Sequence, residues 1–239
     1  MRLTPAQVNL FRQNGYLKLE NAITPESVER LKQSVEAEFI KEEAKGSEKT
    51  SMKLYGFFDR SEAFRNLVQS NAITEPLADL LGPNVVFVKN RHNHASINDR
   101  GRVERRFHRD ILQWSRGLVT AIVYLEAARP DNGCTYVIPG SHNLPFVGVT
   151  QIDPPGGGTW LDEHEVFEGV EQQALPVTIG AGGMLLFDAT LFHSVGDNNS
   201  DESRISLTMG FRSSDELDYA PAPVDVQVRG EHIYRGNDR

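Results

Sequence analysis

The sequence has a single cysteine and no apolar run long enough to span a membrane. A lone cysteine, Cys134, cannot form an internal disulfide, and such sparing use of cysteine is typical of a reducing compartment. A membrane-spanning helix needs about 20 consecutive apolar residues, and the N-terminal segment lacks the apolar region of a secretory signal. We therefore expect a cytoplasmic protein that has no membrane partner.

An excess of basic residues is also missing. The chain carries 33 acidic and 25 basic residues, a formal net charge of -8, whereas nucleic-acid-binding domains usually present a strongly basic face. We expect no nucleic-acid partner, and the charge pattern leaves the oligomeric state open. The 239 residues are enough for one domain with a sizeable core.

The first third of the chain shows helical signals. Thr4 and Gln7 have the spacing of a capping box and Pro5 suits the first helical turn, so a short helix should follow. The charged stretch 41–53 lacks periodicity and should be a solvated loop or a lid. The expected elements are helices over 4–14, 24–39, 61–69 and 74–81 and a strand over 16–19, which together form a mostly helical flank over 1–83.

From residue 84 the pattern changes to that of β-strands, separated by turn residues. We expect a mainly β domain with flanking helices, of class α+β. Its core over 84–213 should be two antiparallel sheets curled into a double-stranded β-helix, the jelly roll of cupin-like proteins, and residues 214–239 should form a C-terminal tail. The β-favouring runs cover 85–88, 107–111, 118–125, 135–138, 175–179, 184–187 and 204–211.

Three residues have the spacing of a metal site. His108 and Asp110 stand two apart, and side chains at i and i+2 of a strand point to the same face. A second histidine, His193, follows on a distant strand. Two imidazoles and one carboxylate leave coordination positions open, an arrangement typical of non-haem Fe(II) enzymes that bind oxygen. The alternative is that both histidines are ordinary core or surface residues and that Asp110 caps a turn.

A second pair, Arg204 and Ser206, also stands two apart and follows His193 by eleven residues. A guanidinium can bond both oxygens of a carboxylate, and this charged contact is stronger than a neutral hydrogen bond. The pair therefore predicts a dicarboxylate co-substrate beside the metal.

With the stretch 131–142, which has the sequence DNGCTYVIPGSH, these residues resemble the phytanoyl-CoA dioxygenase family of Fe(II)- and 2-oxoglutarate-dependent dioxygenases. The resemblance covers most of the chain. It implies that His108, Asp110 and His193 bind Fe(II), that Arg204 and Ser206 hold the far carboxylate of 2-oxoglutarate, and that O2 reacts there. Such enzymes oxidise an unactivated C–H bond of a small-molecule substrate and release succinate and CO2.

The resemblance also carries expectations about single residues. Related halogenases replace the carboxylate with a small residue, so Asp110 favours hydroxylation, desaturation or ring chemistry. The family commonly completes the 2-oxoglutarate pocket with a Lys, Asn or Gln before the metal strand, for which Asn93 is the candidate. It commonly adds a Trp after that strand, but residues 120–124 contain none. His142 is expected to be structural rather than a ligand.

The substrate side of the site is less defined. His92 and His94 stand two apart, before the expected metal strand over 107–111. The sequence is equally consistent with side chains that face the pocket and with side chains that point away from it. Five arginines between 100 and 109 either form a basic rim that attracts an anionic substrate or are solvated surface residues. The candidate substrate contacts are His92, His94, Trp114, Tyr136 and Arg212.

Two other classes of function fit part of the pattern. A metal-dependent cupin-type enzyme that does not use 2-oxoglutarate would need the histidines without Arg204 and Ser206. A non-catalytic metal- or ligand-binding module would usually have lost one of the metal ligands. Because all three are present, the sequence argues against that class.

Overall fold

The computed structural model describes residues 1–44, 53–98, 101, 106–110, 117–145, 160–215 and 225–231 of the chain. Its α-helices are α1 (Pro5–Asn14), α2 (Pro25–Ala44), α3 (Phe57–Arg60), α4 (Glu62–Val68) and α5 (Asn71–Leu81). Its strands are β1 (Tyr16–Leu19), β2 (Lys53–Tyr55), β3 (Val85–Val88), β4 (Asn93–Asn98), β5 (Leu118–Tyr124), β6 (Thr135–Val137), β7 (Leu175–Pro176), β8 (Met184–Asp188), β9 (His193–Val195), β10 (Arg204–Ser213) and β11 (Asp225–Arg229). Four short 3-10 helices are η1 (Ser141–Asn143), η2 (Leu161–Glu163), η3 (Glu165–Phe167) and η4 (Val170–Gln173).

Helix α1 forms where the capping signals predict it. The Thr4 side chain accepts a hydrogen bond from the Gln7 N–H, and the Gln7 side chain accepts one from the Thr4 N–H at 2.8 Å. The helix ends at Asn14, and the next residue, Gly15, adopts a left-handed φ of 78° and donates its N–H to the Phe11 carbonyl. The chain then turns directly into β1 at the edge of the main sheet.

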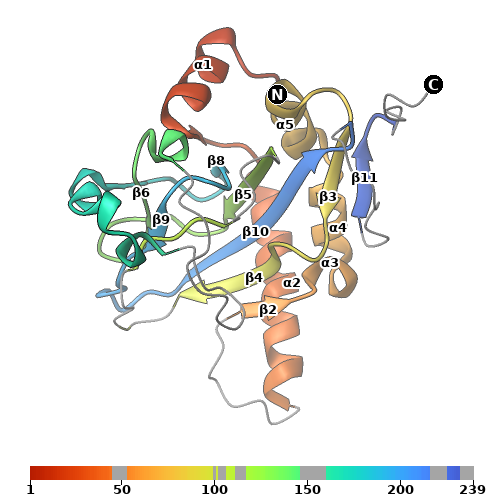
Figure 1. Cartoon of the computed structure of the whole chain (residues 1–239). Coiled ribbons are helices and arrows are strands. Elements are labelled where there is room, and N and C mark those ends of the chain that lie inside the picture. The colour runs from red at the N-terminus through yellow and green to blue at the C-terminus, as the bar shows by residue number, and fades with distance from the viewer. Residues whose placement is uncertain are drawn as a thin grey trace.

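The larger sheet has eight strands and is built around β10. Its order is β1-β8-β5-β10-β3-β11, and β4 and β2 extend it beside β10. Strand β10 pairs with β5 along one edge, and along its other edge it pairs first with β4 and then with β3. In Figure 1, β10 crosses the centre of the molecule and helices α2 to α5 lie behind the sheet and to its right.

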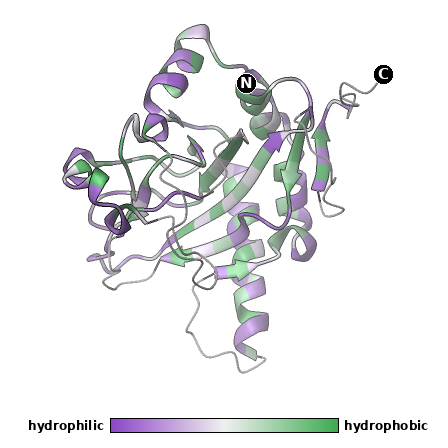
Figure 2. Ribbon diagram, viewed as in Figure 1, coloured by the Kyte–Doolittle hydropathy of each residue, from purple (hydrophilic) through white to green (hydrophobic). Residues whose placement is uncertain are grey.

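The two faces of this sheet differ in polarity because successive side chains of a strand point to opposite faces. Leu207 and Met209 of β10 and Ala121 of β5 belong to a core that also contains Val35 of α2 and Phe64 of α4. The side chains between them face the other way, and many of those are polar. Figure 2 shows green concentrated on the central strands and purple on α1 and the outer turns of α2. Buried polar groups need partners, so the second face is the place to expect a functional site.

A smaller sheet, of order β7-β6-β9, lies opposite that polar face. A second apolar cluster, which includes Tyr124, Val137 and Leu185, packs elements of the two sheets together. Two sheets facing each other, with helices outside the larger one, confirm the expected β-rich double-stranded β-helix with flanking helices.

Several elements differ from the expected ones. The run 107–111 is not a strand over its described part, because His108 alone pairs there, in isolated bridges to His193 and Trp160. In the expected loop over 41–53, α2 continues to Ala44 and β2 begins at Lys53, and 45–52 lie outside the described residues. The expected tail contributes β11, which pairs with β3. In a strand of three to five residues, apolar and polar side chains alternate too few times for the sequence pattern to be distinctive.

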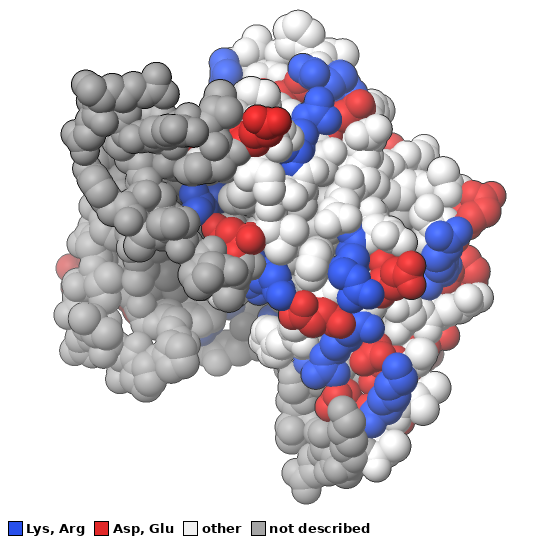
Figure 3. Space-filling view, turned by 90° about the vertical axis from the view of Figure 1, so that its right-hand side faces the viewer, with Lys and Arg blue, Asp and Glu red and all other residues white. Residues whose placement is uncertain are grey.

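Charges of both signs are mixed on the surface. Figure 3 shows Lys and Arg beside Asp and Glu across the described part of one face, with no continuous area of one sign. Among the helices in the described ranges, none combines the length and the apolar composition that crossing a membrane requires.

Candidate metal centre

A cavity of about 430 Å³ opens between the two sheets. Its floor is the polar face of the larger sheet, and Thr135 of β6 and Val195 of β9 contribute to the opposite wall. Five neighbouring strands supply the floor, with Lys53 from β2, His94, Ser96 and Asn98 from β4, Arg204, Ser206 and Thr208 from β10, Thr120 and Ile122 from β5, and Phe187 from β8.

Backbone pairing holds two histidines together at one end of this cavity. The N–H of His108 donates to the His193 carbonyl and the N–H of His193 donates to the His108 carbonyl, both at 3.0 Å. Directly opposed residues of an antiparallel pair present their side chains on the same side, and the two imidazole centroids are 4.4 Å apart. The Asp110 N–H donates to the Ala189 carbonyl at 2.8 Å, which keeps this third side chain beside the two rings.

The surroundings of both imidazoles suit metal binding. Nδ1 of His193 donates to the Leu191 carbonyl at 3.0 Å, and this contact leaves the lone pair on Nε2. Burial lowers the pKa of His108 to about 3, helped by the neighbouring His193. The ring is therefore neutral at physiological pH, which is the form that binds metals.

The two oxygens of Asp110 have different surroundings. Oδ1 is 3.5 Å from Nε2 of His193 and 3.8 Å from Nε2 of His108. Oδ2 accepts a hydrogen bond from Oγ1 of Thr120 at 2.7 Å and lies 2.9 Å from Nε2 of His92. Burial by itself would raise the pKa of this carboxyl, but the neighbouring histidines outweigh burial and lower it. Asp110 is therefore ionised.

These three side chains fit a transition metal. One ligand atom from each of His108, Asp110 and His193 lies within 4.8 Å of the other two, and no other such group occurs among the described residues. Two neutral imidazoles with one carboxylate suit Fe(II) and related divalent ions, and three protein ligands leave coordination positions for other molecules.

Arg204 is buried in the same cavity, and none of the described side chains supplies a counter-charge. Its side chain is 4% exposed, and its guanidinium lies over the Tyr124 ring, 5.4 Å from the centroid, and donates to Oγ of Ser206 at 3.4 Å. Its Nε has no hydrogen-bond partner, and no described carboxylate forms an ion pair with it. Burial therefore lowers the pKa of Arg204. An unpaired buried charge is costly, and a bound carboxylate would compensate it.

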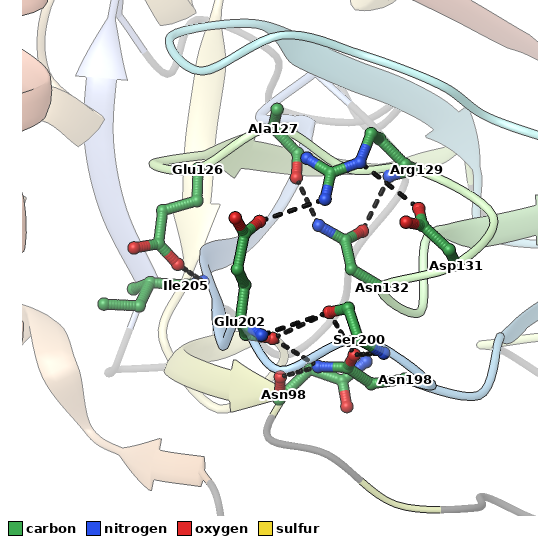
Figure 4. A network of polar contacts seen from close by, with 10 residues as sticks. All are labelled: Asn98, Glu126, Ala127, Arg129, Asp131, Asn132, Asn198, Ser200, Glu202 and Ile205. Carbon is green, nitrogen blue, oxygen red and sulfur yellow. Dashed lines mark hydrogen bonds and ion pairs between the residues drawn. The ribbon is translucent and has the colours of Figure 1, made fainter.

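A polar network holds the loop between His193 and Arg204 (Figure 4). Asn198 donates to the carbonyls of Asn98 and Glu202, both at 2.8 Å. Arg129 forms an ion pair with Glu202 at 3.0 Å. The Ile205 N–H donates to the Glu126 side chain at 2.9 Å. The loop is thereby tied to β4 and to the segment after β5, and Arg204 enters β10 opposite Asn98.

Both histidines that precede the metal strand line the cavity. His94 is 6% exposed, and burial, with lesser effects of Lys53 and His92, lowers its pKa to about 3. Its Nδ1 has no hydrogen-bond partner among the described residues. His92 contacts Asp110, as described above.

Sequence reasoning missed many of the wall residues, among them Thr120, Ile122 and Thr208. The signal was available, because Thr208 continues the alternation of Arg204 and Ser206, and Thr120 and Ile122 alternate on a strand that was expected. Ile122 and Phe187 provide apolar surface in the region where the family pattern would place a Trp.

Asn93 and Arg212 do not contribute to the cavity, contrary to expectation. Oδ1 of Asn93 accepts from the Phe58 N–H at 2.8 Å and its Nδ2 donates to the Lys89 carbonyl at 3.2 Å, so its amide is occupied on the helix side of the sheet. Arg212 lies at the other end of β10 and pairs with Asp225 of β11 at 2.8 Å.

Tyr136 also lies elsewhere. It follows the cavity residue Thr135 on β6 and therefore points to the opposite face of the smaller sheet. There it lines a separate hollow of about 810 Å³, together with Phe167 and several acidic residues of the η2–η4 segment.

The arginine cluster is described only in part. Arg100, Arg102 and Arg105 lie outside the described residues, as does Trp114. Arg106 pairs with Asp162 at 2.8 Å, and its guanidinium lies over the Trp160 ring, 4.4 Å from the centroid.

Arg109 and His142 have structural contacts. Arg109 is buried and donates to the carbonyls of Ser141 and Leu144 at 3.0 and 3.1 Å. Nε2 of His142 donates to the Arg12 carbonyl at 2.9 Å, the structural role expected of it.

The model of the phytanoyl-CoA dioxygenase (PhyH) family matches residues 11–206. The chain belongs to this family. The matched range includes the metal-site residues, Arg204 and Ser206, and the other described residues that line the cavity except Thr208.

Individual relatives match different shares of the chain. An ectoine dioxygenase of Nocardia farcinica is 27% identical over 245 residues, which cover 91% of this chain and 82% of that protein. An uncharacterised protein of Mycobacterium tuberculosis is 30% identical over 128 residues, which cover 51% of this chain and 41% of that protein. The match thus spans less than half the length of the latter relative.

Solved structures share the fold. The non-heme alpha ketoglutarate dependent epimerase SnoN from nogalamycin biosynthesis has a TM-score of 0.72 at 17% identity and covers 96% of this chain and 97% of its own. EctD from S. alaskensis, with bound Fe, has a TM-score of 0.69 at 18% identity and covers 89% of this chain and 77% of its own. At these identities the likeness concerns the fold, which is the double-stranded β-helix with flanking helices.

Proposed function

We propose that this protein is a non-haem Fe(II)- and 2-oxoglutarate-dependent dioxygenase that oxidises an unactivated C–H bond of a small molecule, with release of succinate and CO2. The observation that carries the proposal is a buried, unpaired guanidinium, Arg204, in the same cavity as the triad His108, Asp110 and His193. A metal-binding triad alone fits many enzymes. A carboxylate site beside it fits a dicarboxylate co-substrate.

The roles of the residues follow from their surroundings. His108, Asp110 and His193 would hold Fe(II), which supplies the oxygen chemistry when bound. Arg204 would bind the far carboxylate of 2-oxoglutarate with both guanidinium branches, and Ser206 would add a hydroxyl. Ile122 and Phe187 add apolar surface to the walls of the same cavity.

The charge of the wall restricts the substrate. Among the described residues that line the cavity, Asp110 is the one carboxylate, and it belongs to the metal site. A cationic group of a substrate would find no counter-charge on these described walls, whereas His94 and Ser96 offer hydrogen bonds to a neutral or anionic group. We therefore propose a neutral or anionic substrate, hydroxylated, desaturated or cyclised.

The proposal is tested by metal and co-substrate dependence together. The parent protein should bind one Fe(II) per chain under anaerobic conditions and, with oxygen, form succinate only when 2-oxoglutarate is present. His193→Ala should lose iron binding and succinate formation together, while His164→Gln, outside the cavity, should retain both. Oxygen uptake that is independent of 2-oxoglutarate would favour a cupin-type oxygenase, and full turnover in His193→Ala would contradict the metal site.

A further inference from the structure

His92 contacts the carboxylate of the metal triad without belonging to it. Its Nε2 is 2.9 Å from Oδ2 of Asp110, the oxygen that also accepts from Thr120. The two atoms are close, although their geometry is not that of a standard hydrogen bond. The other oxygen, Oδ1, faces the two triad histidines. The side chains of His92 and Thr120 thus lie beside Oδ2, whereas Oδ1 faces the position expected for the metal.

The backbone at His92 is held in an uncommon conformation. His92 has a φ of 53°, one of two non-glycine residues with positive φ among those described, and a left-handed non-glycine residue costs free energy. The preceding turn packs against β10 at Gly210, where an added Cβ would lie 2.8 Å from the Arg91 carbonyl oxygen. Gly210 therefore lets this turn approach the sheet closely enough for the His92 ring to reach Asp110.

We propose that His92 is a positioning residue that, together with Thr120, holds Oδ2 of Asp110 away from the metal, so that the carboxylate binds the metal through Oδ1 alone. The inference rests on the proposed function, since it concerns the same metal. A carboxylate that binds through one oxygen occupies one coordination position, whereas one that binds through both occupies two. The consequence is that the positions needed by 2-oxoglutarate and oxygen stay open.

His92 is better placed for this role than for metal binding itself. The ligand atoms that lie mutually within 4.8 Å come from His108, Asp110 and His193 and do not include His92. Its Nε2 lies 2.9 Å from Oδ2, the oxygen of Asp110 that does not face the two triad histidines.

The test measures Co(II) binding, with no dependence on turnover. Co(II) replaces Fe(II), and its affinity and visible absorption spectrum are compared in the parent protein, His92→Leu, His92→Gln and Thr120→Val, with His164→Gln as the matched control. Outer partners of metal ligands typically contribute about 10- to 100-fold in metal affinity. His92→Leu and Thr120→Val should each lose affinity by such a factor and change the spectrum. His92→Gln, which keeps an N–H donor, should recover much of both.

A crystal structure of the Co(II) form supplies the direct readout. The parent protein should show Asp110 bound through Oδ1, with His92 and Thr120 on Oδ2, and the double variant of His92→Leu and Thr120→Val should show both oxygens on the metal. If His92→Leu does not fold, His92→Gly tests the same loss with a residue that accepts the left-handed conformation.

Two results would overturn the inference while the proposed function survives. One is an unchanged Co(II) affinity and spectrum in His92→Leu or His92→Gly, and the other is His92 coordinated to the metal in the crystal. A parent protein that binds no Co(II) would instead overturn the metal site, and this inference with it.

Discussion

Replacing Arg204 by methionine should stabilise the ligand-free protein while it removes 2-oxoglutarate binding. The guanidinium is buried and no described carboxylate pairs with it, so the folded state bears the cost of a desolvated charge. Replacement of buried charges by apolar side chains of similar size is often stabilising, by about 1–4 kcal/mol. The cation–π contact with Tyr124 would be lost, at a cost of about 0.5–2 kcal/mol.

The expected net gain is small but measurable. A gain of about 1–2 kcal/mol corresponds to a rise in Tm of roughly 2–8 °C for a chain of this size. Loss of a buried ion pair with the co-substrate costs on the order of 3–5 kcal/mol, which is a few hundredfold or more in the Kd of 2-oxoglutarate at about 1.36 kcal/mol per tenfold change. The two effects have opposite signs, and a general disruption of the fold would not produce both.

Thermal unfolding of the Mn(II)-loaded protein over a range of 2-oxoglutarate concentrations measures both effects. The parent protein should gain about 2.7 kcal/mol at a co-substrate concentration of 100 times the Kd, and Arg204→Met should gain almost nothing. Arg212→Met is the matched control on the same strand, and it should lower the Tm because it leaves Asp225 without its partner, yet keep the response to 2-oxoglutarate. A lower Tm for Arg204→Met, or an undiminished response to the co-substrate, would refute the reasoning.

Two further predictions concern stability and the approach to the metal. Burial lowers the pKa of His94 to about 3 from 6.5, so between these values the unfolded chain binds a proton that the folded chain does not. His94, which faces Lys53 and His92, should therefore make stability fall as the pH decreases below about 6.5, and His94→Gln should flatten that decline in urea unfolding. An equal pH dependence of both proteins would contradict the assignment. Gly210→Ala would place a Cβ 2.8 Å from the Arg91 carbonyl oxygen, and should cost about 1–3 kcal/mol of stability and weaken Co(II) binding. Unchanged urea midpoints and Co(II) affinity would show that the turn before His92 tolerates displacement.

The grouping of the three triad residues, and the placement of Arg204 and Ser206 in the same cavity, were predictable because each rests on a spacing that the fold preserves. His108 and Asp110 stay two residues apart and reach one point even though their segment is not a regular strand, since the bridge between His108 and His193 supplies the extended backbone. Arg204 and Ser206 share a face of β10. The loop that separates Arg204 from His193 is held by its own polar network. The spacing of eleven residues between the two was the signal in the sequence for the position of the guanidinium.

The phase of a strand, in contrast, depends on pairing that a single sequence does not contain. The residues 92–94 could present either Asn93 or the two histidines to the cavity, and a shift of one residue exchanges the two faces. The register of β4 against β10 sets His94 opposite Thr208 and Asn93 opposite Met209. Met209 belongs to the core on the helix side, so Asn93 must face the helices, where its amide bonds to backbone groups. Alternation along β10 alone, with Thr208 as the next alternate residue after Ser206, would have assigned the polar face of that strand correctly. Which residues of β4 lie on the same face is set only by the pairing of β4 with β10.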